Sequence, residues 1–257
     1  MFENLKEKGW EIAFINNANA ILPLNFNQTL VKLEKILAET SVDVEKHIIK
    51  GGGGESDFTI NLRKRFNDLG WKKNNIQINN TITFEGNLPE IELSSTTHEI
   101  DHLIEDNNRL IALEIEWNNK DEFFDRDFQA ITRLYEASAV EAGIIITRGP
   151  NLEKQLGTLI ENYFIQNKIT DHNGHEMLSK RIRDDKGSRY TFPTDKQKIN
   201  IEKKYKSGKS YAESSMKVFK ESKFGSSTTT WKQLNNRIDR KLGSRTPMLF
   251  LGIPEVK

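Results

Sequence analysis

The sequence predicts an α/β protein in which helices flank a mixed central β-sheet, with a helical N-terminal part and a basic C-terminal region. Apolar and polar residues alternate in several short segments, as in half-buried strands, and the segments between them carry apolar residues at helical spacing. The aliphatic run GIIITRG, residues 143–149, is typical of a strand buried on both faces. Helices packed on a sheet of this kind define the α/β class.

Length and composition restrict the class of protein. The 257 residues suffice for one α/β domain, and a hydrophobic content of 36% is enough for a single core. The absence of cysteine excludes disulfides, thiolate metal sites and cysteine nucleophiles. No run reaches the about 18 apolar residues of a membrane span, and the N-terminus has no signal-peptide core, so we expect a cytoplasmic location without a membrane partner.

The N-terminal part is expected to be helical. Apolar residues recur at near-helical spacing across residues 27–50, which predicts one or two helices. The glycine run GGGGES that follows is a mobile hinge or a place where backbone amides approach a phosphate, and the absence of a following Gly-Lys-Ser/Thr disfavours a nucleotide loop. Ser56 is expected to cap a helix over residues 57–69, which Gly70 ends.

Strands are predicted next. Residues 75–84 alternate between apolar and polar, and a loop around residues 87–90 leads into two further strands. The turn EDNNR, residues 105–109, joins these two strands, because Asp and Asn tolerate the positive φ of a tight hairpin.

The two strands of this hairpin place three carboxylates on one face. Glu114 and Glu116 are two residues apart, so they point to the same side, opposite an apolar face that requires a core. A register that pairs odd-numbered with even-numbered residues adds Asp101 to the acidic face and turns Ile100 and Ile104 to the apolar side.

Three converging carboxylates repel one another unless a cation or shared protons relieve them. Oxygen ligands suit hard ions, so we expect Mg²⁺, with Mn²⁺ as a substitute and Ca²⁺ as a non-productive occupant. Such a site supports metal-assisted hydrolysis of a phosphodiester. An amphipathic strand with solvated glutamates shows the same alternation, so the spacing leaves both interpretations open.

A helix is predicted within residues 118–140, where apolar side chains recur at helical spacing from Phe124 to Tyr135. Its first polar residues follow the acidic strand directly and can touch substrate phosphates or a dimer partner; surface pairing of Asp125 with Arg126 is the alternative. The predicted contact residues of this segment are Asn118, Asn119, Lys120 and Arg126. The buried strand at residues 143–149, a helix from Pro150 and a closing strand MLFLGI complete the sheet.

The net charge of +1 conceals a division along the chain. Residues 180–245 contain 19 Lys and Arg but 7 Asp and Glu, so their net charge is +12, and the net charge of the remaining residues is −11. This asymmetry indicates that the basic part faces a polyanion such as nucleic acid, although a solvated lysine-rich surface gives the same count.

Regular signals fade after residue 171, and His172 and His175 are expected at the surface. A hydroxyl-rich loop, GSSTTT, then precedes a basic helix that begins near Trp231. Hydroxyl groups suit phosphate and base-edge contacts, and helix capping explains them equally well. The remaining predicted nucleic-acid contacts are Arg148, Ser226, Ser227, Thr228 and Thr229.

The acid spacing resembles a known nuclease core. The string ID, about a dozen residues, then ExE followed by a helix is similar to the PD-(D/E)XK core of type II restriction endonucleases of the BglII and BamHI kind. The string LEIEWNNKDEFFDRDFQAITRLYEASAVEAGIIITRG resembles BglII-like members further. The likeness covers residues 51–149 well and the C-terminal part loosely. It implies a restriction-endonuclease-like fold as a single domain over residues 1–257, with a catalytic core over 51–165 and a basic DNA-contacting region over 171–257.

The resemblance also implies roles for individual residues. Asp101 and Glu114 become metal ligands, together with the carbonyl of Ile115. Glu116 stands where most of the superfamily has lysine, and it is expected to orient or deprotonate the attacking water or to bind a second ion. Glu55 is a helper acid from the preceding helix.

The function that follows is that of a Mg²⁺-dependent type II restriction endodeoxyribonuclease. It is expected to cut a specific, palindromic double-stranded DNA sequence as a homodimer, with a cognate DNA methyltransferase in the same system but not as a bound subunit. A structure-specific repair or recombination nuclease and a non-catalytic DNA-binding protein are the alternatives. A glycosidase is disfavoured because the two glutamates are on one strand, about 7 Å apart by strand rise.

Overall fold

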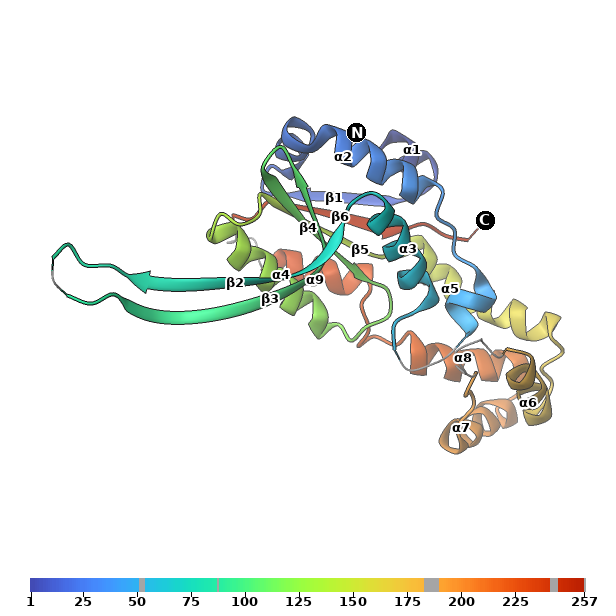
Figure 1. Cartoon of the computed structure of the whole chain (residues 1–257). Coiled ribbons are helices and arrows are strands. Elements are labelled where there is room, and N and C mark those ends of the chain that lie inside the picture. Colours follow the sequence, from blue (N-terminus) through green and yellow to red (C-terminus); the bar gives the residue numbers. More distant parts are fainter. Residues whose placement is uncertain (51–53, 87, 183–189, 241–244, 257) are drawn as a thin grey trace.

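Six strands form one mixed sheet in the part of the chain that the structure describes. This part comprises residues 1–50, 54–86, 88–182, 190–240 and 245–256 of the computed structural model in Figure 1. The strands are β1 (Glu11–Ile15), β2 (Lys72–Ile82), β3 (Ile91–Asp106), β4 (Arg109–Glu116), β5 (Ala142–Arg148) and β6 (Met248–Ile253). They lie in the order β1, β6, β5, β4, β3, β2; β4, β5 and β6 are parallel, and the other pairs are antiparallel. The predicted mixed sheet is confirmed.

Helices cover both faces of the sheet, as predicted (Figure 1). One core forms where α2 (Ala18–Ala38), α3 (Asp57–Asp68) and α5 (Pro150–Gln166) pack on the apolar face of β4. A second core forms where α4 (Glu122–Glu136) and α9 (Trp231–Arg240) pack on the opposite face. The other helical elements are α1 (Glu3–Glu7), the π-helical segment η1 (Val44–Ile49), α6 (His172–Arg181), α7 (Asp195–Lys206) and α8 (Tyr211–Lys223).

Local signals set several boundaries as predicted. Ser56 caps α3, since its hydroxyl accepts a hydrogen bond from the backbone N–H of Thr59 at 3.1 Å, and Gly70 follows the helix with a φ of +95°. The hairpin between β3 and β4 turns through Asn107 and Asn108, whose φ values are 54° and 61°. Positive φ at both turn residues matches the twist of the flanking strands.

Several elements differ from the sequence prediction. The apolar spacing predicts neither β1, which pairs with β6 at the edge of the sheet, nor the helices α6, α7 and α8 of the basic region. α4 begins at Glu122 because the residues before it form backbone hydrogen bonds with residues 227–229 instead. Residues 51–53 of the glycine run lie outside the described residues.

A β-bulge in β3 changes the predicted faces. Lys72 pairs with Leu103 and Asn74 pairs with Ile100, so β3 has one extra residue between these pairs and its alternation reverses. Ile104 packs in the first core as predicted, but Ile100 packs in the second core, beneath α4. The expectation that Ile100 lies opposite the acids is therefore wrong.

The basic region is organised around buried aromatic rings. His175, predicted at the surface, is buried, and its ring nitrogens lie 3.0 Å from the hydroxyls of Tyr190 and Ser215. Phe164 of α5 and Phe219 of α8 pack around them. These contacts join segments far apart in sequence, which explains why local periodicity did not reveal the helices.

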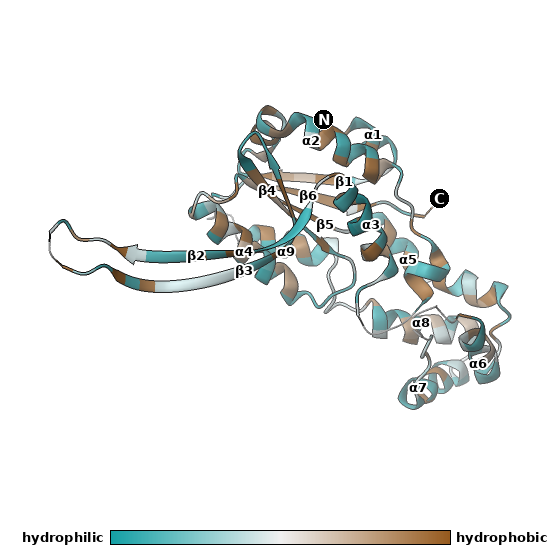
Figure 2. Ribbon diagram, viewed as in Figure 1, coloured by the Kyte–Doolittle hydropathy of each residue, from teal (hydrophilic) through white to brown (hydrophobic). Residues whose placement is uncertain are grey.

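β2 and the first part of β3 form a long hairpin that extends away from the rest of the sheet (Figure 1). β2 is largely hydrophilic, whereas the central strands are largely hydrophobic (Figure 2). No Lys or Arg occurs between Lys73 and Arg109, so the hairpin does not attract a polyanion by charge. Near its end several apolar side chains are exposed: Ile82, Phe84, Leu88, Ile91 and Leu93. Within the described residues, no helix has the length and apolar character needed to cross a membrane.

Replacing His102 by Met is expected to flatten the acid side of the stability curve. His102 is buried against Phe66, and this burial lowers its pKa from 6.5 to about 4. The unfolded chain therefore binds this proton more readily, and the stabilising contribution of the neutral ring is present above pH 6.5 and lost as the pH falls toward 4. The wild-type free energy of unfolding should fall more steeply than that of His102→Met over this interval, by up to about 1.4 kcal/mol per pH unit. Urea denaturation at a series of pH values measures the two slopes, and equal slopes would contradict the assignment.

Candidate active site

β4 carries two acids into a buried pocket. Glu114 and Glu116 leave the same face of the strand, while Leu113 and Ile115 enter the first core on the other face. The two glutamates are only 3% and 2% exposed, because α4 covers their face of the sheet. The shared face is confirmed. The side chains line a pocket of ≈ 620 Å³ with α4 as one wall.

α4 contributes a third buried acid, Asp127, which the sequence analysis did not identify. Asp127 is 2% exposed, and its carboxyl lies within hydrogen-bonding reach of Glu116. The helix approaches the sheet closely because β5 has glycine beneath it: a Cβ on Gly143 would lie 2.6 Å from Cγ2 of Ile131. An acid in the apolar stripe of a predicted helix, one residue before Phe128, is the signal that could have revealed it.

Burial and mutual repulsion raise the pKa of all three carboxyl groups. Loss of solvation is the largest cause at each of them, and the charge of Asp127 adds to it at both glutamates. The pKa of Glu116 rises to about 9, and that of Glu114 rises well above its ordinary range. Asn119 and Arg126 oppose the shift: Nδ2 of Asn119 donates to Oε2 of Glu116 at 2.7 Å, and Nη2 of Arg126 lies 3.6 Å from Oε1. At neutral pH the metal-free cluster therefore retains protons.

Asp101 lies at the rim of this pocket. Its backbone N–H donates to Oε1 of Glu114 at 3.2 Å, which links β3 to the acids of β4. Its side chain is 42% exposed, and Oδ1 lies 3.9 Å from Nζ of Lys73. The structure thus brings together Asp101, Glu114 and Glu116, with the aspartate in the open part of the pocket and the glutamates in its depth.

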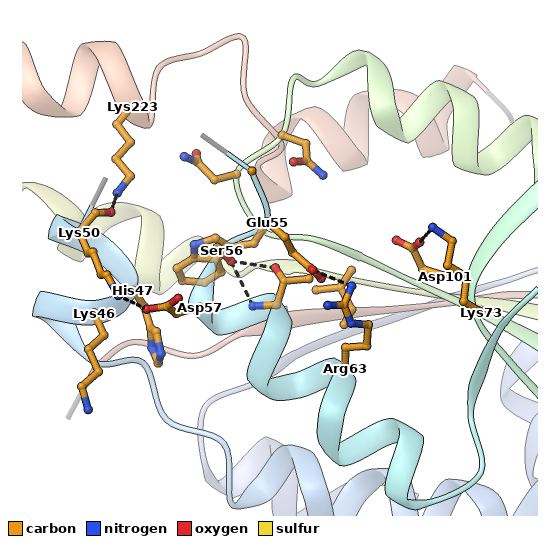
Figure 3. Close-up of a pocket in the computed structure, with 16 residues that line it drawn as sticks. Lys46, His47, Lys50, Glu55, Ser56, Asp57, Arg63, Lys73, Asp101 and Lys223 are labelled. Atoms are coloured by element: carbon orange, nitrogen blue, oxygen red, sulfur yellow. Dashed lines mark hydrogen bonds and ion pairs between the residues drawn. The ribbon is translucent and has the colours of Figure 1, made fainter. Parts of the chain in front are cut away.

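Glu55 belongs to a neighbouring pocket of ≈ 460 Å³, which Asp101 and Ile115 also line (Figure 3). Oε2 of Glu55 is 2.6 Å from Nη1 of Arg63, and Glu55 does not line the pocket of the two glutamates. The carbonyl of Ile115 stays a predicted ligand. The basic side chains that line this second pocket are Lys46, Lys50, Arg63, Lys73 and Lys223.

Two loops that were predicted to contact DNA lie side by side. Residues 118–120 follow β4, residues 225–229 precede α9, and Lys120 and Thr228 form a β-bridge between them. The backbone N–H of Thr229 also donates to the carbonyl of Asn119 at 2.9 Å. Because Asn119 holds Glu116, both loops adjoin the acidic pocket. The exposed predicted residues in these loops are Asn119, Lys120, Ser226 and Ser227, with Asn118 and Thr228 partly exposed.

Arg148 and Thr229 are buried, and this arrangement does not support a direct DNA contact for either of them. The Arg148 guanidinium is 0% exposed and forms an ion pair with Glu153. It also donates to Oδ1 of Asn118 at 2.8 Å, to Oγ1 of Thr228 at 3.0 Å and to the carbonyl of Thr229 at 2.6 Å. Arg148 therefore links the two loops through buried hydrogen bonds.

The donor set of the acidic pocket suits a hard cation. Four of its acids, Asp101, Glu114, Glu116 and Asp127, offer oxygen ligands, and Oδ2 of Asp127 is buried without an N–H or hydroxyl donor among the described residues. His98 also lines the pocket and adds a buried ring nitrogen, Nε2, that has no hydrogen-bond partner within the described part of the chain. Across the described ranges, no three acidic or histidine side chains are already arranged as a complete metal site. The residues thus fit a divalent ion in their chemistry, and the carboxylates would have to turn toward it.

Comparison with known proteins agrees with this geometry. A model of the restriction endonuclease BglII/BglIII family matches residues 10–253, nearly the whole chain. The chain belongs to the BglII/BglIII restriction endonuclease family. The resemblance drawn from the acid spacing is therefore confirmed, and the protein is an endodeoxyribonuclease that acts on double-stranded DNA. A search of curated proteins found no match. Restriction endonucleases generally need a divalent metal, in keeping with the oxygen ligands of the pocket.

Replacing Glu116 by Gln is expected to make the metal-free protein less sensitive to alkaline pH. Burial raises the Glu116 pKa from 4.5 to about 9, so the folded chain holds a proton that the unfolded chain releases. The stabilising contribution of this proton is present below pH 4.5 and is lost as the pH rises through 9. In EDTA, the wild-type free energy of unfolding should fall toward pH 9 by at most about 1.4 kcal/mol per pH unit, and that of Glu116→Gln should fall less.

The control is Glu136→Gln, which removes an exposed acid from the last turn of α4. It should follow the wild-type curve. Parallel curves for wild type and Glu116→Gln would contradict the proposed protonation.

Proposed function

We propose that this chain is a Mg²⁺-dependent type II restriction endonuclease that cuts a specific, palindromic sequence in double-stranded DNA. The observation that carries this proposal is the pocket lined by Asp101, Glu114 and Glu116, in a member of a restriction endonuclease family. Mn²⁺ should substitute for Mg²⁺, since both accept oxygen ligands.

The positions of the acids suggest a different catalytic role for each of them. Asp101 and Glu114, with the carbonyl of Ile115, would hold the ion. When bound, the ion neutralises phosphate charge and activates water. Glu116 is fixed through Oε2 by Asn119, and a bound cation would displace the proton that Glu116 holds in the metal-free protein, so that its carboxylate could orient the attacking water or take its proton. Glu55, paired with Arg63 in the adjoining pocket, is a candidate helper.

Positive charge lies beside the acids where a DNA strand would pass. Lys46, Arg63 and Lys73 line the second pocket, whose wall includes Asp101 (Figure 3). Phosphate contacts of this kind position the DNA, whereas contacts to base edges specify its sequence. The proposed DNA contacts in the two loops and at the start of α4 are Asn118, Asn119, Lys120, Arg126, Ser226, Ser227 and Thr228.

A homodimer is proposed because cutting both strands of a palindrome needs two acid sets related by a twofold axis. A cognate DNA methyltransferase is expected as a separate protein of the same system, and a cytoplasmic location is proposed because the DNA substrate is there.

Asp101→Asn and Glu114→Gln are expected to abolish cleavage and to leave DNA binding intact or tighter, because each change removes negative charge beside phosphate. Loss of metal-based charge stabilisation of several kcal/mol corresponds to a rate loss on the order of 10³-fold. Cleavage of phage DNA with Mg²⁺ and mobility shifts in EDTA measure the two properties.

The matched control is Glu105→Gln, an exposed acid further along β3 that does not line the acidic pocket. It should cut like the wild type. Retained cleavage in either active-site variant would reject the role of that residue.

Sequencing of the fragment ends should show a single recognition sequence that reads the same on both strands. Discrete fragments support restriction. Cutting confined to DNA junctions would indicate a repair nuclease, and shifted but uncut DNA would indicate binding alone.

A further inference from the structure

Asp127 is a buried acid that has no part in the catalytic roles proposed for Asp101, Glu114 and Glu116. Oδ1 accepts hydrogen bonds from Nε and Nη2 of Arg126 at 2.9 and 2.8 Å. Oδ2 is buried as well, and no N–H or hydroxyl donor among the described residues reaches it; the neighbouring acid, Glu116, can donate to Asp127 only while it holds a proton. Other buried side-chain atoms of the described residues also lack a partner, but Oδ2 of Asp127 is the one carboxylate oxygen among them. Lost solvation has its largest cost for a carboxylate oxygen, and a cation would offset that cost.

Two other buried charged side chains, Arg148 and Arg237, have hydrogen-bond partners that explain their burial. The Arg148 guanidinium is surrounded by Glu153 and three further acceptors. Arg237 donates to both Asp121 and Asp125 at 3.0 Å. Each of these cations has acceptors around it, whereas Asp127 lies within hydrogen-bonding reach of another acid, Glu116.

Arg126 is a weak and replaceable counter-ion for this cluster. Its side chain is 58% exposed and lies over the ring of Phe123, with Cζ 4.3 Å from the ring centroid. An ion pair so open to solvent contributes little to stability and does not offset the burial of three carboxyl groups. A small divalent ion inside the pocket would neutralise them more effectively than a guanidinium at its mouth.

We propose that Asp127 is a further metal-binding carboxylate of the pocket, and that Arg126 takes the place of the cation in the metal-free protein. This inference rests on the proposed function, because it takes the ion to be the one that serves cleavage. With Asp127, three carboxylates from two elements, β4 and α4, meet in the depth of the pocket, and Asp101 completes the set at the rim. Such an all-oxygen set matches the preference of Mg²⁺ and Mn²⁺.

Titration with Mn²⁺ in the absence of DNA, followed by electron paramagnetic resonance of the free ion, tests this inference. Asp127→Asn is expected to weaken Mn²⁺ binding about 10- to 100-fold, the range found when groups that support a metal are removed. The control Glu136→Gln should bind Mn²⁺ like the wild type. In EDTA, Asp127→Asn should be at least as stable as the wild type, because it relieves repulsion; a purely structural aspartate would instead lower the stability.

The variant Glu114→Gln separates this inference from the proposed function. If Glu114→Gln weakens Mn²⁺ binding and Asp127→Asn does not, the role of Asp127 is rejected and the proposed site stands. If neither variant changes Mn²⁺ binding, the proposed metal site fails and the inference fails with it.

Arg126→Gln provides a second test that does not depend on the folding of the Asp127 variant. Removing the competing cation should tighten Mn²⁺ binding several-fold. Unchanged or weaker binding in Arg126→Gln would overturn the role given to Arg126.

Discussion

The packing of α4 on the sheet is the constraint on which the candidate site depends. Gly143 allows the helix to approach β5, and Phe124, Phe128 and Ile131 anchor it in the second core. This contact removes water from the acidic face of β4 and at the same time adds Asp127 to it. Burying like charges together raises the pKa of each carboxyl, so the contact that stabilises the sheet also creates the need for a cation.

The chain contains two polar clusters with opposite physical character. Around Arg148, donors and acceptors are matched, and the result is a rigid tie between the loop after β4 and the loop before α9. In the acidic pocket, the carboxyl groups of Glu114, Glu116 and Asp127 are buried together beside a half-exposed Arg126, and Oδ2 of Asp127 has no N–H or hydroxyl donor among the described residues. The first cluster is complete without a ligand, whereas the second is complete only with protons or a metal.

The sequence-based prediction succeeded where the controlling interactions are local. The alternation of β4 placed Glu114 and Glu116 on one face, the Asn-Asn turn gave the hairpin, and Ser56 gave the start of α3. It failed where distant segments decide. A single extra residue in β3 places the Ile100 side chain in the second core, and no residue propensity predicts such a β-bulge. His175 is buried because aromatic residues from α5, α8 and the loop before α7 surround it, although its own neighbours in sequence are not apolar.

From the sequence alone came the chemistry of the site: oxygen ligands, their period of two along a strand, and the family that this spacing resembles. Those features depend only on side-chain identity and on the geometry of an extended backbone. The tertiary structure decided how deeply each acid lies, that Glu55 occupies a neighbouring pocket, and that Asp127 joins the glutamates from a helix. It also decided that Arg148 supports the loops from within. The solvation of each carboxyl group and its coupling to the other charges depend on the distances between helices and strands. Those distances are set by how the helices pack on the sheet, and no single segment of the sequence determines them.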